Sequence, residues 1–205
     1  MITVEETKGV LTVTLDRPEK ANSLTHAMLS ELVDVMEAAR TAPAVILTGR
    51  GQVFSAGADL DEARQGLATS DVWERLSQAI ASLQGLSIAA LNGTLAGGAM
   101  GMALACDLRM SVPTAKFFYP VMKLGFLPQP SDPARMSALI GPARTKLILM
   151  AGQKIEAPEA LAFGLIDRIV APEVLMSEAV SLTEDVVKAD PKVAHGIKSL
   201  CTKPG

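Results

Sequence analysis

Hydrophobic and polar residues alternate at the start of the chain in the manner of a β-hairpin. Segment 10–15, VLTVTL, places every second apolar side chain on one face, which is typical of a half-buried strand. Ile2 and Val4, before the turn sequence TKG, indicate the partner strand. A helical stripe follows, formed by Met28, Leu29, Leu32, Val33 and Met36.

Two short apolar runs further along the chain each stop at a glycine. They are AVILTG at 44–49 and LSIAALNG at 86–93, and such runs are typical of strands covered on both faces. The helical stripe between them consists of Trp73, Leu76, Ile80 and Leu83. The remaining pattern predicts strands at 108–112 and 165–170, helices at 134–139, 144–150 and 157–163, and one long helix over 174–188. Strands that alternate with helices predict a single α/β domain over residues 1–205, built on a parallel sheet.

Composition narrows the class of protein. Hydrophobic residues make up 49% of the 205 residues and charged residues 20%, which is a globular composition. The net charge of −3 argues against a nucleic-acid partner. The two cysteines, Cys106 and Cys201, lack the spacing of a metal or redox motif, and we expect no metal site. No leader segment and no apolar run of membrane-spanning length is visible, so we expect a cytoplasmic protein with no membrane partner.

Two glycine-containing turns, FSAGADL at 54–60 and LAGGAMG at 95–101, each follow a predicted buried strand. Parallel strands direct the loops after them to one edge of the sheet, where ligands of α/β proteins bind. Glycine allows the backbone to approach a ligand closely, and two facing N–H groups form an oxyanion hole. Phosphate sites are excluded, because GRGQVFSAG lacks the Lys-Ser/Thr of a P-loop and GGAMG is not the dinucleotide fingerprint.

Five segments in this order resemble the enoyl-CoA hydratase/isomerase family, the crotonase superfamily. They are RPEKANSL, FSAGADL, NGTLAGGAMGMALACD, LGFLP and AFGLIDRIV, and the resemblance runs from about residue 2 to about residue 200. It implies an α/β fold of stacked ββα units, here with a shortened C-terminal helical region, and a homo-oligomer that is a trimer or a dimer of trimers. It also implies an acyl-CoA thioester as ligand, with coenzyme A as part of the substrate and no permanently bound cofactor.

The resemblance also assigns site residues. The N–H groups of Ala58 and Gly98 match the two oxyanion donors of the family. The matches to its coenzyme A contacts are Lys20, Ala21, Ala56, Asp59 and Leu60. Lys20 is equally consistent with a solvated loop charge, and Asp59 with a residue that orders its own turn. An apolar pocket wall is expected from Met100, Val121 and Leu127.

The family pattern breaks at the acid/base residues. The two glutamates of the family's hydratases fall here on Gly101 and Val121, and neither side chain can hold or move a proton. We therefore expect no ordinary hydration of an enoyl-CoA, and expect glutamates restored at both positions to recover it. Gln129 stands where some relatives carry an aspartate, and it cannot ionise. Asp132 is the remaining acid/base candidate, although its place before Pro133 also fits a helix N-cap.

Other polar residues near these motifs are weaker candidates for a catalytic role. Tyr119 and Lys123 flank the same pocket wall, Asp107 is expected to be structural, and His26 and His195 match no catalytic position. Three functions stay open: an acyl-CoA-processing enzyme with non-standard acid/base chemistry, a non-catalytic acyl-CoA-binding protein, and a ligand-free structural subunit. The acyl group and the type of reaction stay open as well.

Overall fold

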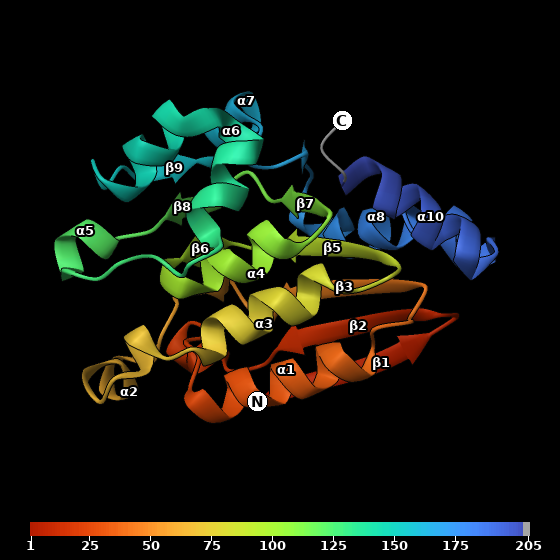
Figure 1. The fold of residues 1–205 in the computed structure, drawn as a ribbon, viewed down its shortest axis with the longest axis horizontal. Coiled ribbons are helices and arrows are strands. Elements are labelled where there is room, and N and C mark those ends of the chain that lie inside the picture. Colours follow the sequence, from red (N-terminus) through yellow and green to blue (C-terminus); the bar gives the residue numbers. More distant parts are fainter. Residues whose placement is uncertain (203–205) are drawn as a thin grey trace.

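The computed structural model describes residues 1–202 and contains a large sheet on which the predicted strands lie (Figure 1). Its strands, in spatial order, are β1 (Ile2–Thr7), β2 (Val10–Leu15), β3 (Ala44–Gly49), β5 (Leu86–Leu91), β7 (Leu108–Ser111) and β10 (Arg168–Ile169). The β1–β2 hairpin is antiparallel, as predicted, and every other pair is parallel. The strand predicted at 165–170 is shorter than expected, because only 168 and 169 pair with β7.

A second, smaller sheet was not anticipated from the sequence. Its strands, in order, are β4 (Val53–Ser55), β6 (Thr94–Ala96), β8 (Lys116–Phe118) and β9 (Ile155–Glu156). β4, β6 and β8 run parallel, and each comes directly after a strand of the large sheet. A helical segment then follows each of them, so the chain repeats a ββα unit, as the family resemblance implies.

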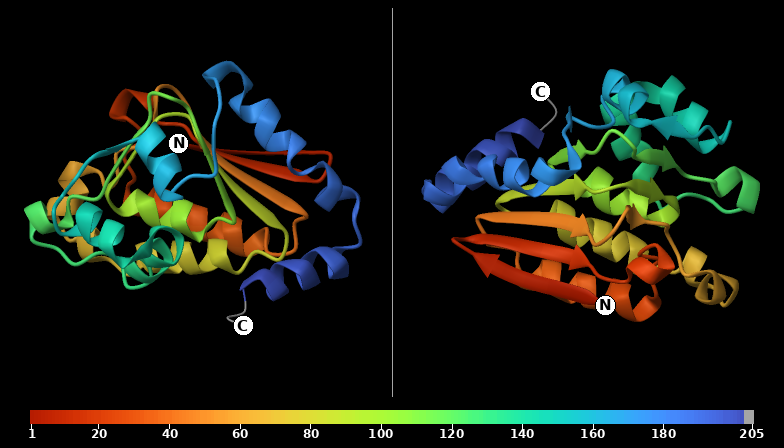
Figure 2. Two further views of the ribbon diagram at one scale, coloured as in Figure 1. Left: turned by 90° about the horizontal axis from the view of Figure 1, so that it is seen from above. Right: turned by 180° about the vertical axis from the view of Figure 1, so that it is seen from behind.

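Helices cover both faces of the large sheet. The longer ones are α1 (His26–Ala38), α3 (Val72–Ala81), α4 (Met100–Ala105), α6 (Asp132–Leu149), α7 (Ala157–Phe163), α8 (Leu175–Ser181) and α10 (Pro191–Thr202). The shorter ones are α2 (Leu60–Arg64), α5 (Val121–Leu124) and α9 (Glu184–Lys188). α1, α3 and α4 lie side by side on one face, and α8 packs on the other (Figures 1 and 2). This double cover explains why the sequences of β3 and β5 are almost entirely apolar.

The prediction of one long helix over 174–188 is wrong. The chain forms α8 and α9 instead, with a break at Leu182 and Thr183. The Thr183 hydroxyl donates to the carbonyl of Val180 at 2.7 Å, and the Thr183 N–H donates to the same oxygen at 2.9 Å. These bonds tighten the turn and compete with helical pairing, so the helix ends there.

The helices predicted at 134–139 and 144–150 correspond to the two parts of α6. They are separated by a kink at Gly141, whose φ of +77° is incompatible with a helix. α10 was not predicted; its first turn is capped by Asp190, whose carboxylate accepts from the N–H of Lys192 at 2.8 Å.

α10 is anchored to the large sheet through Lys198. Its ammonium donates to the Gly85 carbonyl and to Asp107 Oδ2, both at 2.8 Å. Asp107 also accepts from the N–H and hydroxyl of Ser87, which confirms its structural role.

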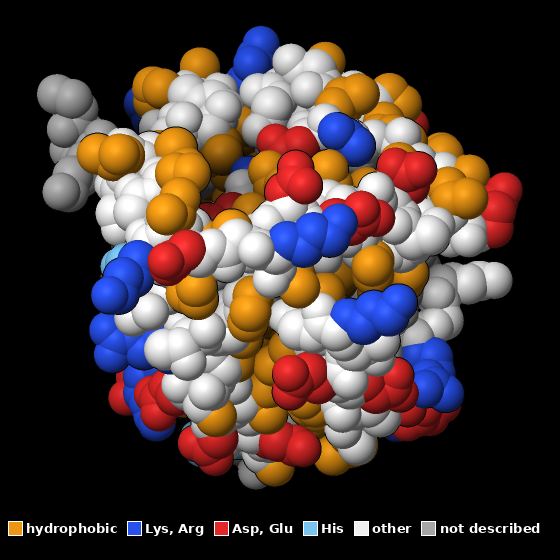
Figure 3. All heavy atoms as spheres, turned by 90° about the vertical axis from the view of Figure 1, so that its right-hand side faces the viewer, with side chains coloured by type: hydrophobic (Ala, Val, Ile, Leu, Met, Phe, Trp, Pro, Cys, Tyr) orange, Lys and Arg blue, Asp and Glu red, His pale blue; other side chains and the backbone are white. Residues whose placement is uncertain are grey.

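The other side of α10 is open to solvent. Val193, Ile197 and Leu200 are 55%, 59% and 73% exposed. Figure 3 faces these C-terminal helices and shows hydrophobic side chains on the surface among charged ones. None of the helices within residues 1–202 combines the length and apolar character needed to cross a bilayer.

Candidate functional site

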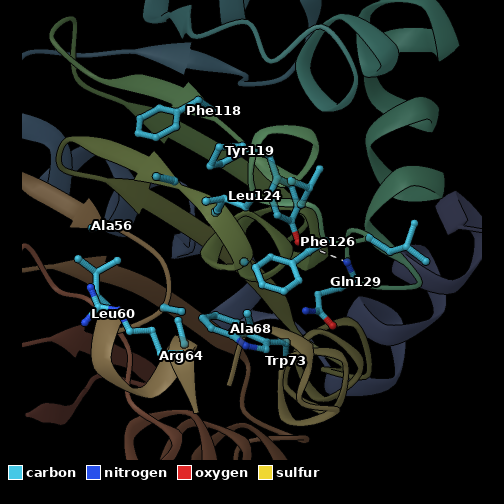
Figure 4. Close-up of a pocket in the computed structure, with 18 residues that line it drawn as sticks. Ala56, Leu60, Arg64, Ala68, Trp73, Phe118, Tyr119, Leu124, Phe126 and Gln129 are labelled. Atoms are coloured by element: carbon cyan, nitrogen blue, oxygen red, sulfur yellow. Dashed lines mark hydrogen bonds between the residues drawn. The ribbon is translucent and has the colours of Figure 1, made fainter. Parts of the chain in front are cut away.

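A cavity of about 430 Å³ opens between α2 and α5, at the left end of the molecule in Figure 1. Its walls are mostly apolar and come from α2, α3, α5 and the turns after β4, β6 and β8 (Figure 4). The cavity brings together six residues expected at the site, namely Ala56, Ala58, Leu60, Gly98, Val121 and Leu127. The sequence motifs thus converge on one concave site.

The two glycine turns touch each other at this cavity. They follow β4 and β6, the short strands of the second sheet, and not the long buried strands directly. Gly57 has a φ of +91°, and a Cβ atom there would lie 2.9 Å from the carbonyl oxygen of Ala96. A Cβ atom on Gly97, whose φ is +59°, would lie 3.6 Å from the Cα of Gly57. Glycine at position 57 is therefore required for the two turns to lie this close.

The backbone of Ala58 is held in place by Leu24. The Leu24 N–H donates to the Gly57 carbonyl at 2.8 Å, and the Asp59 N–H donates to the Leu24 carbonyl at 2.9 Å. In such a parallel bridge the middle residue, Ala58, directs its own N–H to the opposite side. The Ala58 N–H is thus turned away from Leu24, and Ala58 itself lines the cavity.

Gly98 lies in the first turn of a 3₁₀ helix, Gly97–Ala99, that leads into α4. N–H groups in a first turn have no partner within the helix. A Cβ atom at Gly98 would lie 3.1–3.3 Å from three atoms of the Trp73 indole. That ring is fixed by its own N–H, which donates to the Leu67 carbonyl at 2.8 Å. A side chain at position 98 would therefore press against the indole ring, and glycine avoids this contact.

Three of the expected coenzyme A contacts do not line the cavity. Lys20 is exposed, and Ala21 accepts a hydrogen bond from the N–H of Ala56 at 3.0 Å. Asp59 accepts from Arg17 at 2.8 Å and caps α2. The hydrogen bond from Arg17 lowers the pKa of Asp59, and bonds from backbone N–H groups of α2 lower it further against the effect of burial. Asp59 thus orders its own turn.

The apolar wall also differs from the expectation at one residue. Val121 and Leu127 line the cavity, but Met100 is buried in the core behind it. Lys123 is exposed on α5 and does not line the cavity, and His26 and His195 are exposed, as expected.

Asp132 is fully buried at the first position of α6. The N-cap interpretation is wrong, because Ser131 occupies that position and the Asp132 carboxylate makes no capping bond. Asp132 Oδ2 instead accepts from the hydroxyl of Tyr119 at 3.0 Å. That hydroxyl also accepts from the N–H of Gln129 at 3.3 Å, the dashed line in Figure 4. Within the described chain, Asp132 Oδ1 has no hydrogen-bond partner.

Burial raises the pKa of Asp132 to about 7. The Tyr119 hydrogen bond and the charge of Arg135 oppose this shift, and the negative charge of Glu74 adds to it. Burial and the neighbouring Asp132 also raise the pKa of Tyr119. The Glu74 carboxylate is bound by the N–H and hydroxyl of Ser131 at 3.1 and 3.0 Å. The pair of Tyr119 and Asp132 is therefore a buried acid whose charge state changes near neutral pH.

Gly101 lies directly against this carboxylate. A Cβ atom at position 101 would lie 2.8 Å from Asp132 Oδ1 and 2.7 Å from the hydroxyl oxygen of Ser77. Such contacts are shorter than packed atoms tolerate, so any side chain there would displace buried neighbours. The expectation that a glutamate could simply be restored at 101 is therefore corrected. The Asp132 carboxylate occupies the adjacent space.

Known proteins of similar sequence and structure give one consistent family. The family model described as enoyl-CoA hydratase/isomerase matches residues 5–204. The chain belongs to this family. A putative enoyl-CoA hydratase of Thermus thermophilus is 36% identical over 98% of this chain and 83% of its own length. A short-chain-enoyl-CoA hydratase of Clostridium acetobutylicum is 32% identical over 93% of this chain and 76% of its own length.

Solved protein structures that resemble this one support the same family. The crystal structure of an enoyl-CoA hydratase from Bacillus anthracis superposes with a TM-score of 0.91 at 30% identity, over 98% of this chain and 82% of that one. Pseudomonas aeruginosa DspI gives a TM-score of 0.89 at 28% identity, over 98% of this chain and 85% of that one. The α/β architecture with its stacked ββα units is thus the crotonase fold.

The acid/base residues are the part of this site that departs from the family pattern. The sequence indicates Asp132 but not its partnership with Tyr119, which lies thirteen positions earlier, directly after β8. One signal was present. Gly101 lies inside α4, where glycine costs about 1 kcal/mol relative to alanine, and that cost indicates a close neighbour.

Proposed function

We propose that this protein is an enzyme that processes acyl-CoA thioesters and stabilises a thioester enolate in an oxyanion hole. The N–H groups of Ala58 and Gly98 would hold the thioester oxygen, and coenzyme A would enter as part of the substrate, with no permanently bound cofactor. One observation carries the proposal: two glycine turns lie against each other and line one apolar cavity.

The environment suits this chemistry. Fixed N–H dipoles act most strongly on a developing negative charge where water is excluded, and a single donor is worth roughly 3–4 kcal/mol in the transition state. The cavity walls around Ala58 and Gly98 are largely apolar. Leu24 is hydrogen-bonded to both sides of Ala58, and the Trp73 ring packs next to Gly98, which favours donors already in place when charge develops.

An enzyme is favoured over a non-catalytic acyl-CoA-binding protein by the buried acid beside the cavity. Strongly shifted carboxyl groups cluster at catalytic sites, and Asp132 is the acid/base candidate because positions 101 and 121 carry none. A ligand-free structural subunit would not require two glycine turns that pack against each other at an apolar cavity.

Two further properties belong to this proposal. The exposed apolar side chains of α10 favour a homo-oligomer, such as a trimer, in which they would be covered. Analytical ultracentrifugation should show this assembly at tens of micromolar protein, and a strict monomer would contradict it. We also propose a cytoplasmic location, which fractionation of the source cells would test.

Calorimetry with matched ligands tests the function. Butanoyl-CoA should bind, and S-butyl-CoA, a thioether that lacks the carbonyl oxygen, should bind more weakly. The Gly98→Ala variant should lose this preference because its side chain displaces Trp73. Gly196→Ala is the control, since a Cβ atom there meets no atom of residues 1–202 within 4 Å. Failure of every acyl-CoA to bind at millimolar concentration would reject the proposal.

A further inference from the structure

The search for chemistry beyond thioester binding leads to the hydroxyl of Tyr119. Tyr119 lines the cavity that also holds Ala58 and Gly98, whereas Asp132 lies behind it and does not line the cavity. The hydroxyl joins the two, because it donates to Asp132 Oδ2 at 3.0 Å. A proton can therefore pass between the cavity and the buried carboxylate through this one oxygen.

The hydrogen bonds to the described residues leave the hydroxyl one free acceptor position. A phenolic oxygen has one proton and two lone pairs. Its proton is donated to Asp132, and one lone pair accepts from the N–H of Gln129 at 3.3 Å. The second lone pair remains for a group in the cavity, and the Gln129 N–H would stabilise negative charge on the oxygen.

Three elements enforce this arrangement around the carboxylate. Gly101 on α4 leaves room for it, since a side chain there would lie within 3 Å of Asp132 Oδ1. Glu74 on α3 and Arg135 on α6 are the charged groups that act on it, and their effects on its protonation oppose each other. The glycine that removes the family's glutamate thus makes space for an acid from a different helix.

We infer that Tyr119 is the catalytic acid/base of the site and that Asp132 acts through it as the acceptor of its proton. This inference rests on the proposed function, and it assigns the site to proton transfer at the carbon next to the thioester carbonyl. Positions 101 and 121 carry no carboxylate that could position a water molecule, so we assign the site to this proton transfer and not to addition of water.

The step balances without a further reactant. The C–H bond at Cα breaks, its electron pair enters the enolate, and the enolate oxygen lies on the N–H groups of Ala58 and Gly98. The proton goes to the Tyr119 oxygen as the phenolic proton passes to Asp132 Oδ2. The reverse transfer returns a proton to Cα, or to Cγ where the enolate is conjugated with a β,γ double bond.

Exchange of the Cα hydrogens of trans-3-hexenoyl-CoA in D₂O tests the inference, followed by mass spectrometry across about pH 5 to pH 9. The wild-type rate should rise with pH as Asp132 loses its proton and level off above an apparent pKa near 7. Tyr119→Phe should slow exchange about 10²–10⁴-fold. Asp132→Asn should also slow it and should abolish the pH dependence, which a merely structural role would not change.

Binding of S-butyl-CoA, measured on the same samples, separates the two proposals. If no coenzyme A compound binds to the folded protein, both the function and the inference fail. If the analogue binds but the wild type exchanges no deuterium, the inference alone is overturned. It is also overturned if either folded variant keeps more than about a tenth of the wild-type rate. Should Tyr119→Phe fail to fold by circular dichroism, the Asp132→Asn pH profile decides alone.

Discussion

Replacing Asp132 by asparagine should stabilise the protein at alkaline pH. The amide has nearly the shape of the carboxyl group but never ionises, and it can still accept the Tyr119 hydrogen bond. The carboxylate of the wild type is fully buried, and one of its oxygens has no hydrogen-bond partner within residues 1–202. Ionisation in the folded state is therefore costly, and the substitution removes that cost.

The magnitude follows from the pKa of Asp132, which burial raises from 3.8 to about 7. Between these values the folded protein binds a proton that the unfolded chain has released, so its free energy of unfolding falls as pH rises. The contribution is fully present below about pH 4 and is lost as pH passes about 7. Each unit of pKa is worth about 1.4 kcal/mol, so the whole effect is on the order of 4 kcal/mol.

Urea unfolding at several pH values and one fixed protein concentration provides the assay. The two proteins should have similar free energies of unfolding near pH 4, and the variant should be about 4 kcal/mol more stable near pH 8. Asp34→Asn, on the exposed side of α1, controls for the loss of one carboxylate. A difference between wild type and Asp132→Asn that stays constant from pH 4 to pH 8 would refute the reasoning.

Two further outcomes are expected. Gly101→Ala should lower the free energy of unfolding by about 1–3 kcal/mol through overpacking against Asp132. The control, Gly196→Ala in α10, should raise it by up to about 1 kcal/mol. Equal effects of the two substitutions in urea unfolding would contradict the close contact at Gly101. Crotonyl-CoA hydration by the wild type, measured by the loss of the enoyl absorbance, should stay well below about 1 s⁻¹, and Gly101→Glu should not raise it. A wild-type turnover above that rate would show that water is activated without a glutamate at 101 or 121.

Much of the fold could be predicted because single elements carry strong local patterns. The apolar runs of β3 and β5 and the stripe of α1 repeat with the periods of a buried strand and an amphipathic helix. The second sheet was missed because β4, β6, β8 and β9 have only two or three residues each, too few for a period. The prediction of one long helix over 174–188 failed because threonine also occurs inside helices, so nothing in the sequence marks Thr183 as the residue whose hydroxyl bond follows the end of α8.

The site likewise has a part that the sequence predicts and a part that it does not. Each oxyanion turn was predicted from a short continuous glycine motif, at 54–60 and at 95–101, and the structure brings both turns to one cavity. The partnership of Tyr119 and Asp132 depends on how β8 and α6 pack, which no local pattern encodes. From the sequence, Asp132 before Pro133 fits an N-cap as well as an acid/base residue, and only the packing of α3 and α4 around it shows that its carboxylate is buried.

The central claim is that the N–H groups of Ala58 and Gly98 polarise a thioester carbonyl. Infrared difference spectra of butanoyl-CoA with a ¹³C-labelled carbonyl, free and bound, measure this directly. Hydrogen bonds from both N–H groups should weaken the C=O bond, so the band of the bound ligand should move to lower wavenumber in the wild type and in Gly196→Ala, and less in Gly98→Ala. A bound ligand whose carbonyl band coincides with that of the free thioester in water, or lies above it, would contradict the account.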